Sequence, residues 1–185
     1  QCWLEQGCGQ TSTTDIAREA GVSQGALYKH FGSKEELLAA TTERLFELLK
    51  SDFQKAFAKV GTRGEKGSPV RRVLKEVGRI FSSPENAVLV EIFALSRTDP
   101  TLQEFLRPVL RFHRDNLHVL AAELFPEAAV HNPRFGVAID AILSVFQGAA
   151  LHSIVMGVGP DAAALSGYIE SIAEHELQAP YGGTR

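Results

Sequence analysis

The chain has 185 residues, of which 44% are hydrophobic, and its formal net charge is −3. This composition excludes an intrinsically disordered chain and is sufficient for one large or two small domains with a packed core. Because we find no secretory signal and no apolar run that we expect to span a bilayer, the sequence predicts a soluble, cytoplasmic protein.

Two short helices, a tight turn between them and the start of a third helix are predicted over residues 11–38. Ser12 is placed to cap the first helix, with Asp15 three residues later in a capping box. Gly21 is placed to end that helix in the left-handed conformation, which costs glycine little. Ser23 is placed to cap the second helix. This order is typical of a helix-turn-helix, although a small helical subdomain without nucleic acid has the same spacing.

The second helix begins with small and polar residues and continues with residues that can bond phosphate. Small residues allow the backbone to approach a major groove, and the side chain of Gln24 can reach base edges. Tyrosine, lysine and histidine side chains can donate to phosphate oxygens. We therefore predict that nine residues contact DNA: Ser12, Ser23, Gln24, Gly25, Ala26, Tyr28, Lys29, His30 and Lys34.

The run DIAREAGVSQGALYKHFGSKEELL resembles the DNA-binding signature of the tetracycline-repressor (TetR) family of transcriptional regulators. The resemblance implies a repressor that releases its operator DNA when a small molecule binds. It also implies a full first helix before this run, of which residues 2–7 resemble only the last turn. The matching pieces are Asp15-Ile16-Ala17, Ala20-Gly21-Val22-Ser23, Gly25, Leu27-Tyr28, His30-Phe31, Ser33-Lys34 and Leu37.

The charge of this region does not have the basic character expected of a DNA-binding module. Residues 1–50 hold five Lys and Arg residues against seven Asp and Glu residues, a net charge of −2. Lys29, His30 and Lys34 nevertheless cluster on the predicted contact surface. A head that no longer binds DNA is therefore one alternative. A helical enzyme or lipid-carrier domain with an accidental helix-turn-helix likeness is another.

Apolar periodicity predicts helices over the rest of the chain, and no segment alternates with the period of a strand. A long helix begins at a capping box of Ser33 and Glu36 and extends to about Val60, and residues 61–69 form a Gly-rich loop. We predict an all-α protein with an N-terminal helix-turn-helix DNA-binding head (1–50) and a helical effector-binding and dimerisation domain (51–180). The later helices are expected to begin at Pro69, Ser83-Pro84, Thr101, Asn132-Pro133 and Asp161, with Pro108 kinking or splitting the third of them.

No pattern in the sequence indicates an enzyme, a metal site or a cofactor site. His113 and His118 are five residues apart rather than the four that place two metal ligands on one helix face, and Cys2 and Cys8 match no metal or redox spacing. Polar and aromatic residues in the later helices either form a solid core or line a pocket for a mainly apolar or aromatic effector. The candidate pocket residues are Phe81, Phe93, Phe112, His113, Asn116, Phe146 and Gln147.

A two-fold homodimer is expected, because reading an operator with a helix-turn-helix usually takes two heads about one turn of DNA apart. Small residues at helical spacing in the helix that ends near Met156 allow a partner helix to approach closely. The alternative is that this face packs against the core of its own domain. The predicted interface residues are Ala138, Ala141, Ile142, Val145, Gly148, Ala149, His152, Tyr168, Ile169 and Ile172.

Overall fold

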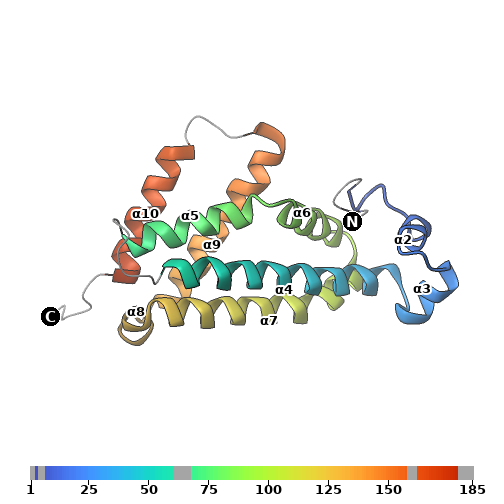
Figure 1. Cartoon of the computed structure of the whole chain (residues 1–185), viewed down its shortest axis with the longest axis horizontal. Helices are drawn as coiled ribbons and strands as arrows, with labels where there is room; N and C mark the ends of the chain where they lie inside the picture. The colour runs from blue at the N-terminus through green and yellow to red at the C-terminus, as the bar shows by residue number, and fades with distance from the viewer. Residues whose placement is uncertain (1–2, 4–6, 61–67, 158–161, 179–185) are drawn as a thin grey trace. The chain divides into compact units, whose positions relative to one another are not determined.

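The computed structural model of the chain describes residues 3, 7–60, 68–157 and 162–178, and it contains only helices and turns over these residues. This confirms the predicted all-α class. Residues 61–67 of the predicted loop, the predicted cap Asp161 and most of the predicted turn 2–7 lie outside the described residues. The helices, labelled in Figure 1, are α2 (Thr13–Glu19), α3 (Gln24–His30), α4 (Lys34–Val60), α5 (Pro69–Phe81), α6 (Pro84–Ser96), α7 (Pro100–Leu124), α8 (Pro126–His131), α9 (Phe135–Met156) and α10 (Ala162–Gln178).

The chain groups into two compact units. The first unit combines Gln1–Leu49 with Ser83–His113, and the second combines Lys50–Ser82 with Arg114–Arg185. The predicted boundary after residue 50 lies next to the first of these divisions. The structure differs from the prediction in one respect, because it groups α6 and the first half of α7 with the helix-turn-helix.

Several later helices begin at or next to the residues predicted for them, although α9 begins at Phe135 rather than at Asn132-Pro133, because Asn132 caps the end of α8. Pro69 begins α5 as predicted, and the backbone N–H of Asn86 donates to the Ser83 side chain at 3.3 Å to cap α6. Pro108 does not split α7, which is one helix of 25 residues with this exposed proline inside it. Sequence analysis missed the short helix α8.

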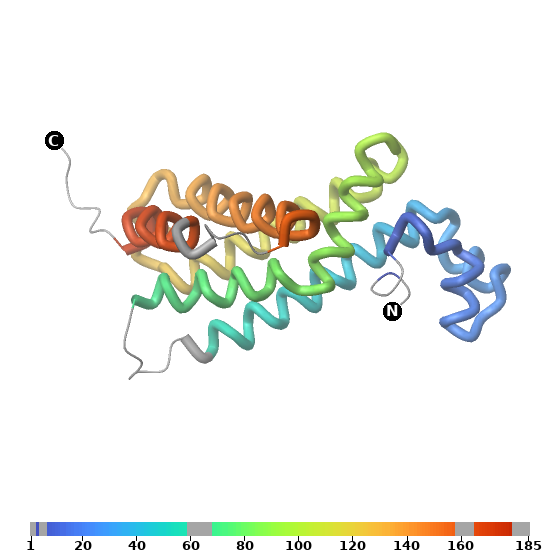
Figure 2. Tube along the Cα trace, turned by 90° about the horizontal axis from the view of Figure 1, so that it is seen from above, coloured from blue at the N-terminus to red at the C-terminus, as the bar shows by residue number. Residues whose placement is uncertain are grey.

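In the second unit, α10 packs against α5, α8 and α9, and α9 also contacts α5 and α8. Figures 1 and 2 both show α9 and α10 side by side. Arg71 of α5 pairs with Glu170 of α10, and Arg134 pairs with Glu176 at 2.6 Å. Because the arginines are exposed, we expect these pairs to fix the register of α10 more than to add stability.

Helix α9 is long and apolar, a property that core helices of globular proteins share with membrane spans. Within the described residues it is the one helix that is long and apolar enough to cross a membrane by length and composition, with a mean hydropathy of 1.5 over its most apolar window. The polar residues Asp140, Gln147 and His152 interrupt its apolar run. Only 11% of that window is buried, so α9 presents a large apolar surface.

Candidate nucleic-acid interface

Helix α2 begins and ends as its sequence predicts. The Asp15 backbone N–H donates to the Ser12 hydroxyl at 3.2 Å and the Ser12 backbone N–H donates to the Asp15 carboxylate at 3.1 Å, which completes the capping box. At the other end Gly21 has a φ of +67°. Val22 N–H donates to Ala17 C=O at 2.9 Å and Gly21 N–H donates to Arg18 C=O at 3.1 Å, the two hydrogen bonds of a Schellman motif.

Helix α3 presents the predicted contact residues to solvent. Ser23 caps the helix by accepting from Ala26 N–H at 3.1 Å, and Leu27 is buried beneath it. A Cβ added at Gly25 would meet only the Ser23 hydroxyl, at 3.9 Å, so the space over this turn is open. Ala26 is half-buried, whereas the exposed residues are Ser12, Ser23, Gln24, Gly25, Tyr28, Lys29 and His30.

Thr13 joins the two helices, and sequence analysis missed this role. Its hydroxyl lies 3.1 Å from the Tyr28 hydroxyl and 3.5 Å from the Gln24 amide nitrogen, so it holds both side chains near the start of α2. A threonine directly after the Ser12 cap was the available signal, but the helix pairing that brings it to Tyr28 is not encoded locally.

The start of α4 departs slightly from the predicted capping box. The Ser33 hydroxyl accepts from Glu36 N–H at 3.1 Å as expected. The Glu36 carboxylate, however, accepts from Gly32 N–H at 2.7 Å, one residue earlier than predicted. This contact fixes the turn between α3 and α4. It leaves Lys34, half-buried, as the first residue of α4.

Two arginines of the head form ion pairs with neighbouring carboxylates. Arg18 pairs with Asp15 at 2.6 Å and Arg44 pairs with Glu47 at 2.8 Å, and all four side chains are at least partly exposed. Hydrogen bonds from the Ser12 side chain and backbone, together with Arg18, lower the pKa of Asp15 from its ordinary value. Asp15 is therefore ionised at neutral pH and offsets Arg18, so the positive charge expected to meet phosphate is that of Lys29 and Lys34.

Comparisons with known proteins agree with this geometry. Residues 1–41 match the family described as "Bacterial regulatory proteins, tetR family". An uncharacterized HTH-type transcriptional regulator of Mycobacterium tuberculosis (strain ATCC 25618 / H37Rv) is 33% identical over 162 residues, which are 85% of this chain and 77% of the relative. The chain belongs to the TetR family. It is accordingly a DNA-binding transcriptional regulator, and the helical enzyme or carrier alternative is not supported.

Other TetR-like proteins share parts of the sequence or the fold. BetI of Rhizobium meliloti (strain 1021) is 30% identical over 122 residues, 66% of this chain and 60% of BetI. A transcriptional regulator from Rhodococcus sp. Rha1 superposes with a TM-score of 0.67 at 23% identity, covering 96% of this chain and 93% of that one. FadR from Bacillus subtilis, solved in complex with stearoyl-CoA, gives a TM-score of 0.63 at 17% identity, covering 95% and 92%. These two structures show the fold.

The predicted effector residues do not gather around one cavity. Phe93 and His113 belong to the first unit, where the ring of Phe46 lies 6.5 Å from Phe93 and stacks on His113 at 3.7 Å. Phe112 is 65% exposed, so in this structure it does not wall an interior pocket. Sequence periodicity put Phe112 and His113 on an apolar helix but did not show which way that helix faces.

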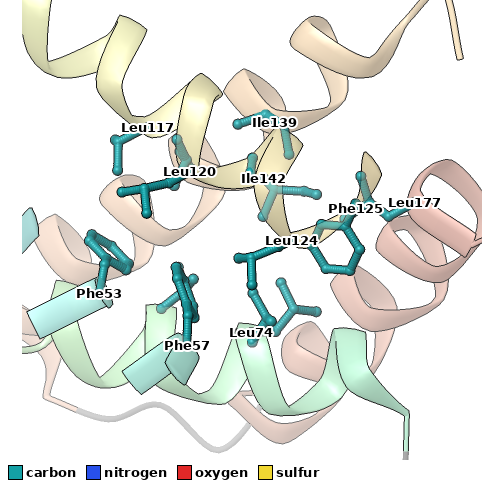
Figure 3. Close-up of a pocket in the computed structure, with 14 residues that line it drawn as sticks. Phe53, Phe57, Leu74, Leu117, Leu120, Leu124, Phe125, Ile139, Ile142 and Leu177 are labelled. Carbon is teal, nitrogen blue, oxygen red and sulfur yellow. The ribbon is translucent and has the colours of Figure 1, made fainter. Parts of the chain in front are cut away.

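Four of these residues lie in the second unit. The rings of Phe81 and Phe146 are 6.1 Å apart, Gln147 is half-buried, and the Asn116 side chain accepts from Lys50 at 3.2 Å. A described cavity in the same unit is lined by other residues from α4, α5, α7, α9 and α10, and by the cap of α8 (Figure 3). The lining is Phe53, Phe57, Val73, Leu74, Val77, Leu117, Leu120, Ala121, Leu124, Phe125, Ile139, Ile142, Leu143 and Leu177.

The predicted dimer residues divide into two sets. Ala138, Ile142 and Ile169 are buried within the chain, and Ile142 also lines the cavity, so these three face the core of their own unit. Val145 is half-buried. The exposed set is Ala141, Gly148, Ala149, His152, Tyr168 and Ile172.

Lys34→Ala is expected to weaken binding on every DNA sequence and to reduce the slope of log affinity against log salt by about one unit, because one phosphate contact is lost. The measurement is fluorescence anisotropy at several salt concentrations, on a duplex selected from random DNA by the wild type. Lys55→Ala, which removes the same charge from an exposed position later in α4, is the control. Unchanged affinity and slope for Lys34→Ala would contradict this contact.

Proposed function

We propose that this TetR-family regulator is a dimeric repressor that binds operator DNA through α3 and releases it when a neutral, apolar effector enters the second unit. The observation that supports this most directly is the combination of an exposed, capped α3 with a wholly apolar cavity in a separate unit. The proposed site of action is the cytoplasm, where operator DNA is found.

The chemistry of the cavity supports an effector without charge. Every lining side chain is aliphatic or aromatic, and Figure 3 shows them converging from several helices. Burying a charged group among such side chains costs several kcal/mol unless it is paired. An acyl chain, an alkylbenzene or a similar molecule meets no such penalty. The FadR structure, which holds stearoyl-CoA, is one case of this fold in complex with a ligand.

The size of the cavity supports a coupled structural change. Its volume is about 60 Å³, whereas small-molecule sites usually have roughly 300–1,000 Å³. An effector of ordinary size must therefore move lining side chains to enter. Phe53 and Phe57 belong to α4, the helix whose first residue is Lys34. A ligand that favours a different position of these two rings would act on the same helix that contacts DNA.

The exposed face of α9 supports the dimer. The residues that follow one another at helical spacing on this face are small or apolar, and no side chain approaches the Cβ position of Gly148 within 4 Å. A continuous exposed apolar face of this kind marks an interaction surface. A second copy of the chain would cover it in a two-fold interface, as TetR-family regulators do. The proposed face is Val137, Ala141, Gly148, Leu151 and Val155 of α9, with Leu165, Tyr168 and Ile172 of α10.

Ala121→Leu tests the effector site by filling the cavity. We expect the variant to bind the selected duplex as the wild type does, while toluene or a similar neutral aromatic releases the duplex at least about tenfold less effectively, because the added carbons occupy the ligand volume. Anisotropy of labelled duplex measures both, and benzoate serves as the charged comparison molecule. Ala122→Leu, at the next residue and outside the lining, is the matched control. Equal release from the two variants would contradict the site.

A further inference from the structure

The turn that leads into the helix-turn-helix is held by a side chain from α6. The Cys8 backbone N–H donates to Oε2 of Glu91 at 2.6 Å, although the two residues are 83 positions apart in sequence. Both residues belong to the first unit. Cys8 is fully buried, and Thr11, also buried, donates its hydroxyl to Gly7 C=O at 2.7 Å. Cys8 and Thr11 are therefore packed within the unit, whereas Gly9 and Gln10 between them are exposed.

The backbone conformation at position 7 favours glycine. The φ of Gly7 is +79°, and a Cβ added there would lie 3.0 Å from Oε2 of Glu91. The positive φ strains any other residue at this position, and an added Cβ would in addition require the carboxylate to shift by a few tenths of an ångström. Burial, and then the negative charge of Glu91, raise the pKa of the Cys8 thiol to about 12, so the thiol stays neutral.

The contact is placed to set the position of α2. Thr11 immediately precedes Ser12, the cap of α2, so the held turn ends where the DNA-binding helix pair begins. A hydrogen bond between a backbone N–H and an ionised carboxylate is about twice as strong as a neutral one. Within the helix-turn-helix, the contact between the Thr13 and Tyr28 hydroxyls ties α3 to α2, so a change in the position of α2 would also move α3.

We propose that Glu91 is a positioning residue for operator binding: its carboxylate fixes the Gly7–Thr11 turn and so sets the direction in which each head presents α3 to DNA. Glu91 does not touch DNA in this proposal. In a dimer the direction of the two heads decides which separation of operator half-sites fits best. The proposal therefore rests on the dimer proposed above, and it predicts an effect on half-site spacing.

The test compares Glu91→Ala and Glu91→Gln with the wild type on three duplexes. One is the palindrome selected from random DNA by the wild type, and the others have its half-sites moved apart or together by one base pair. Glu85→Gln, which removes a charge from the first turn of the same helix, is the control. Anisotropy gives the affinities. Circular dichroism melting shows whether each variant is folded, and Glu91→Gln, which retains an acceptor oxygen, covers the case in which Glu91→Ala does not fold.

We expect Glu91→Ala to bind the selected palindrome at least about tenfold more weakly than the wild type does. Its preference for the selected half-site spacing over the two shifted spacings should fall at least about threefold, and Glu91→Gln should lie between Glu91→Ala and the wild type. Equal weakening on all three duplexes would overturn the proposal, because a role in stability alone lowers the active fraction without changing spacing preference. Wild-type preference in both variants would overturn it too. If the wild type itself showed no preference for half-site spacing, the proposed dimer would be wrong. This result distinguishes failure of the dimer proposal from failure of the role proposed for Glu91.

Discussion

Gly148→Arg is expected to convert the dimer into a monomer and to lower operator affinity by about 10²- to 10⁴-fold, the gain that linking two binding modules provides. Gly148 is exposed in the single chain, and its Cβ position has no neighbouring atom within 4 Å. The monomer can therefore accommodate the arginine. A partner helix packed against this glycine cannot, because the new side chain adds both bulk and an unpaired charge at the contact.

Light scattering at micromolar concentration gives the mass, and anisotropy on the selected duplex gives the affinity. Val130→Arg is the matched control, because Val130 is a 76% exposed apolar residue of α8 outside the proposed face. We expect that control to remain dimeric. A wild type with the mass of one chain, or a Gly148→Arg variant with the mass of two, would show that the exposed face of α9 has another role.

Gly25→Leu is expected to lower operator affinity by roughly 10- to 100-fold while the free energy of unfolding stays the same or rises slightly. The new side chain enters open space in the first turn of α3, where only the Ser23 hydroxyl lies within 4 Å of its Cβ. Leucine also favours a helix over glycine by somewhat less than about 1 kcal/mol. On DNA the same side chain would stand between α3 and the groove, and each lost base contact costs about 1–3 kcal/mol.

Gly9→Leu separates this effect from a general disturbance of the head. Gly9 is exposed, has no atom within 4 Å of its Cβ position, and precedes the predicted contact surface. Thermal melting and anisotropy on the selected duplex, measured for both variants, give stability and affinity. If Gly25→Leu bound as tightly as Gly9→Leu, α3 would not be the helix that enters the groove.

The helix-turn-helix could be predicted from the sequence because its signals act over a few residues. Ser12 with Asp15, Gly21 and Ser23 satisfy the ends of their helices by hydrogen bonds that span at most five residues, and the structure contains each of them. The family resemblance rested on the same short run. A cap or a left-handed glycine works the same way in almost any surroundings, so these elements depend little on the rest of the chain.

Only the tertiary structure decided how the long helices face. Helix α9 is apolar nearly all round, so its periodicity could not show that Ile142 turns inward to the cavity while Gly148 stays exposed. Phe112 of α7 was expected to line a pocket, but the packing of the helices leaves it exposed. The Glu91 to Cys8 contact joins residues 83 positions apart, and no local pattern predicts such a pairing. Helix caps are set by neighbours in sequence, whereas the inward face of an apolar helix is set by the helices that pack against it.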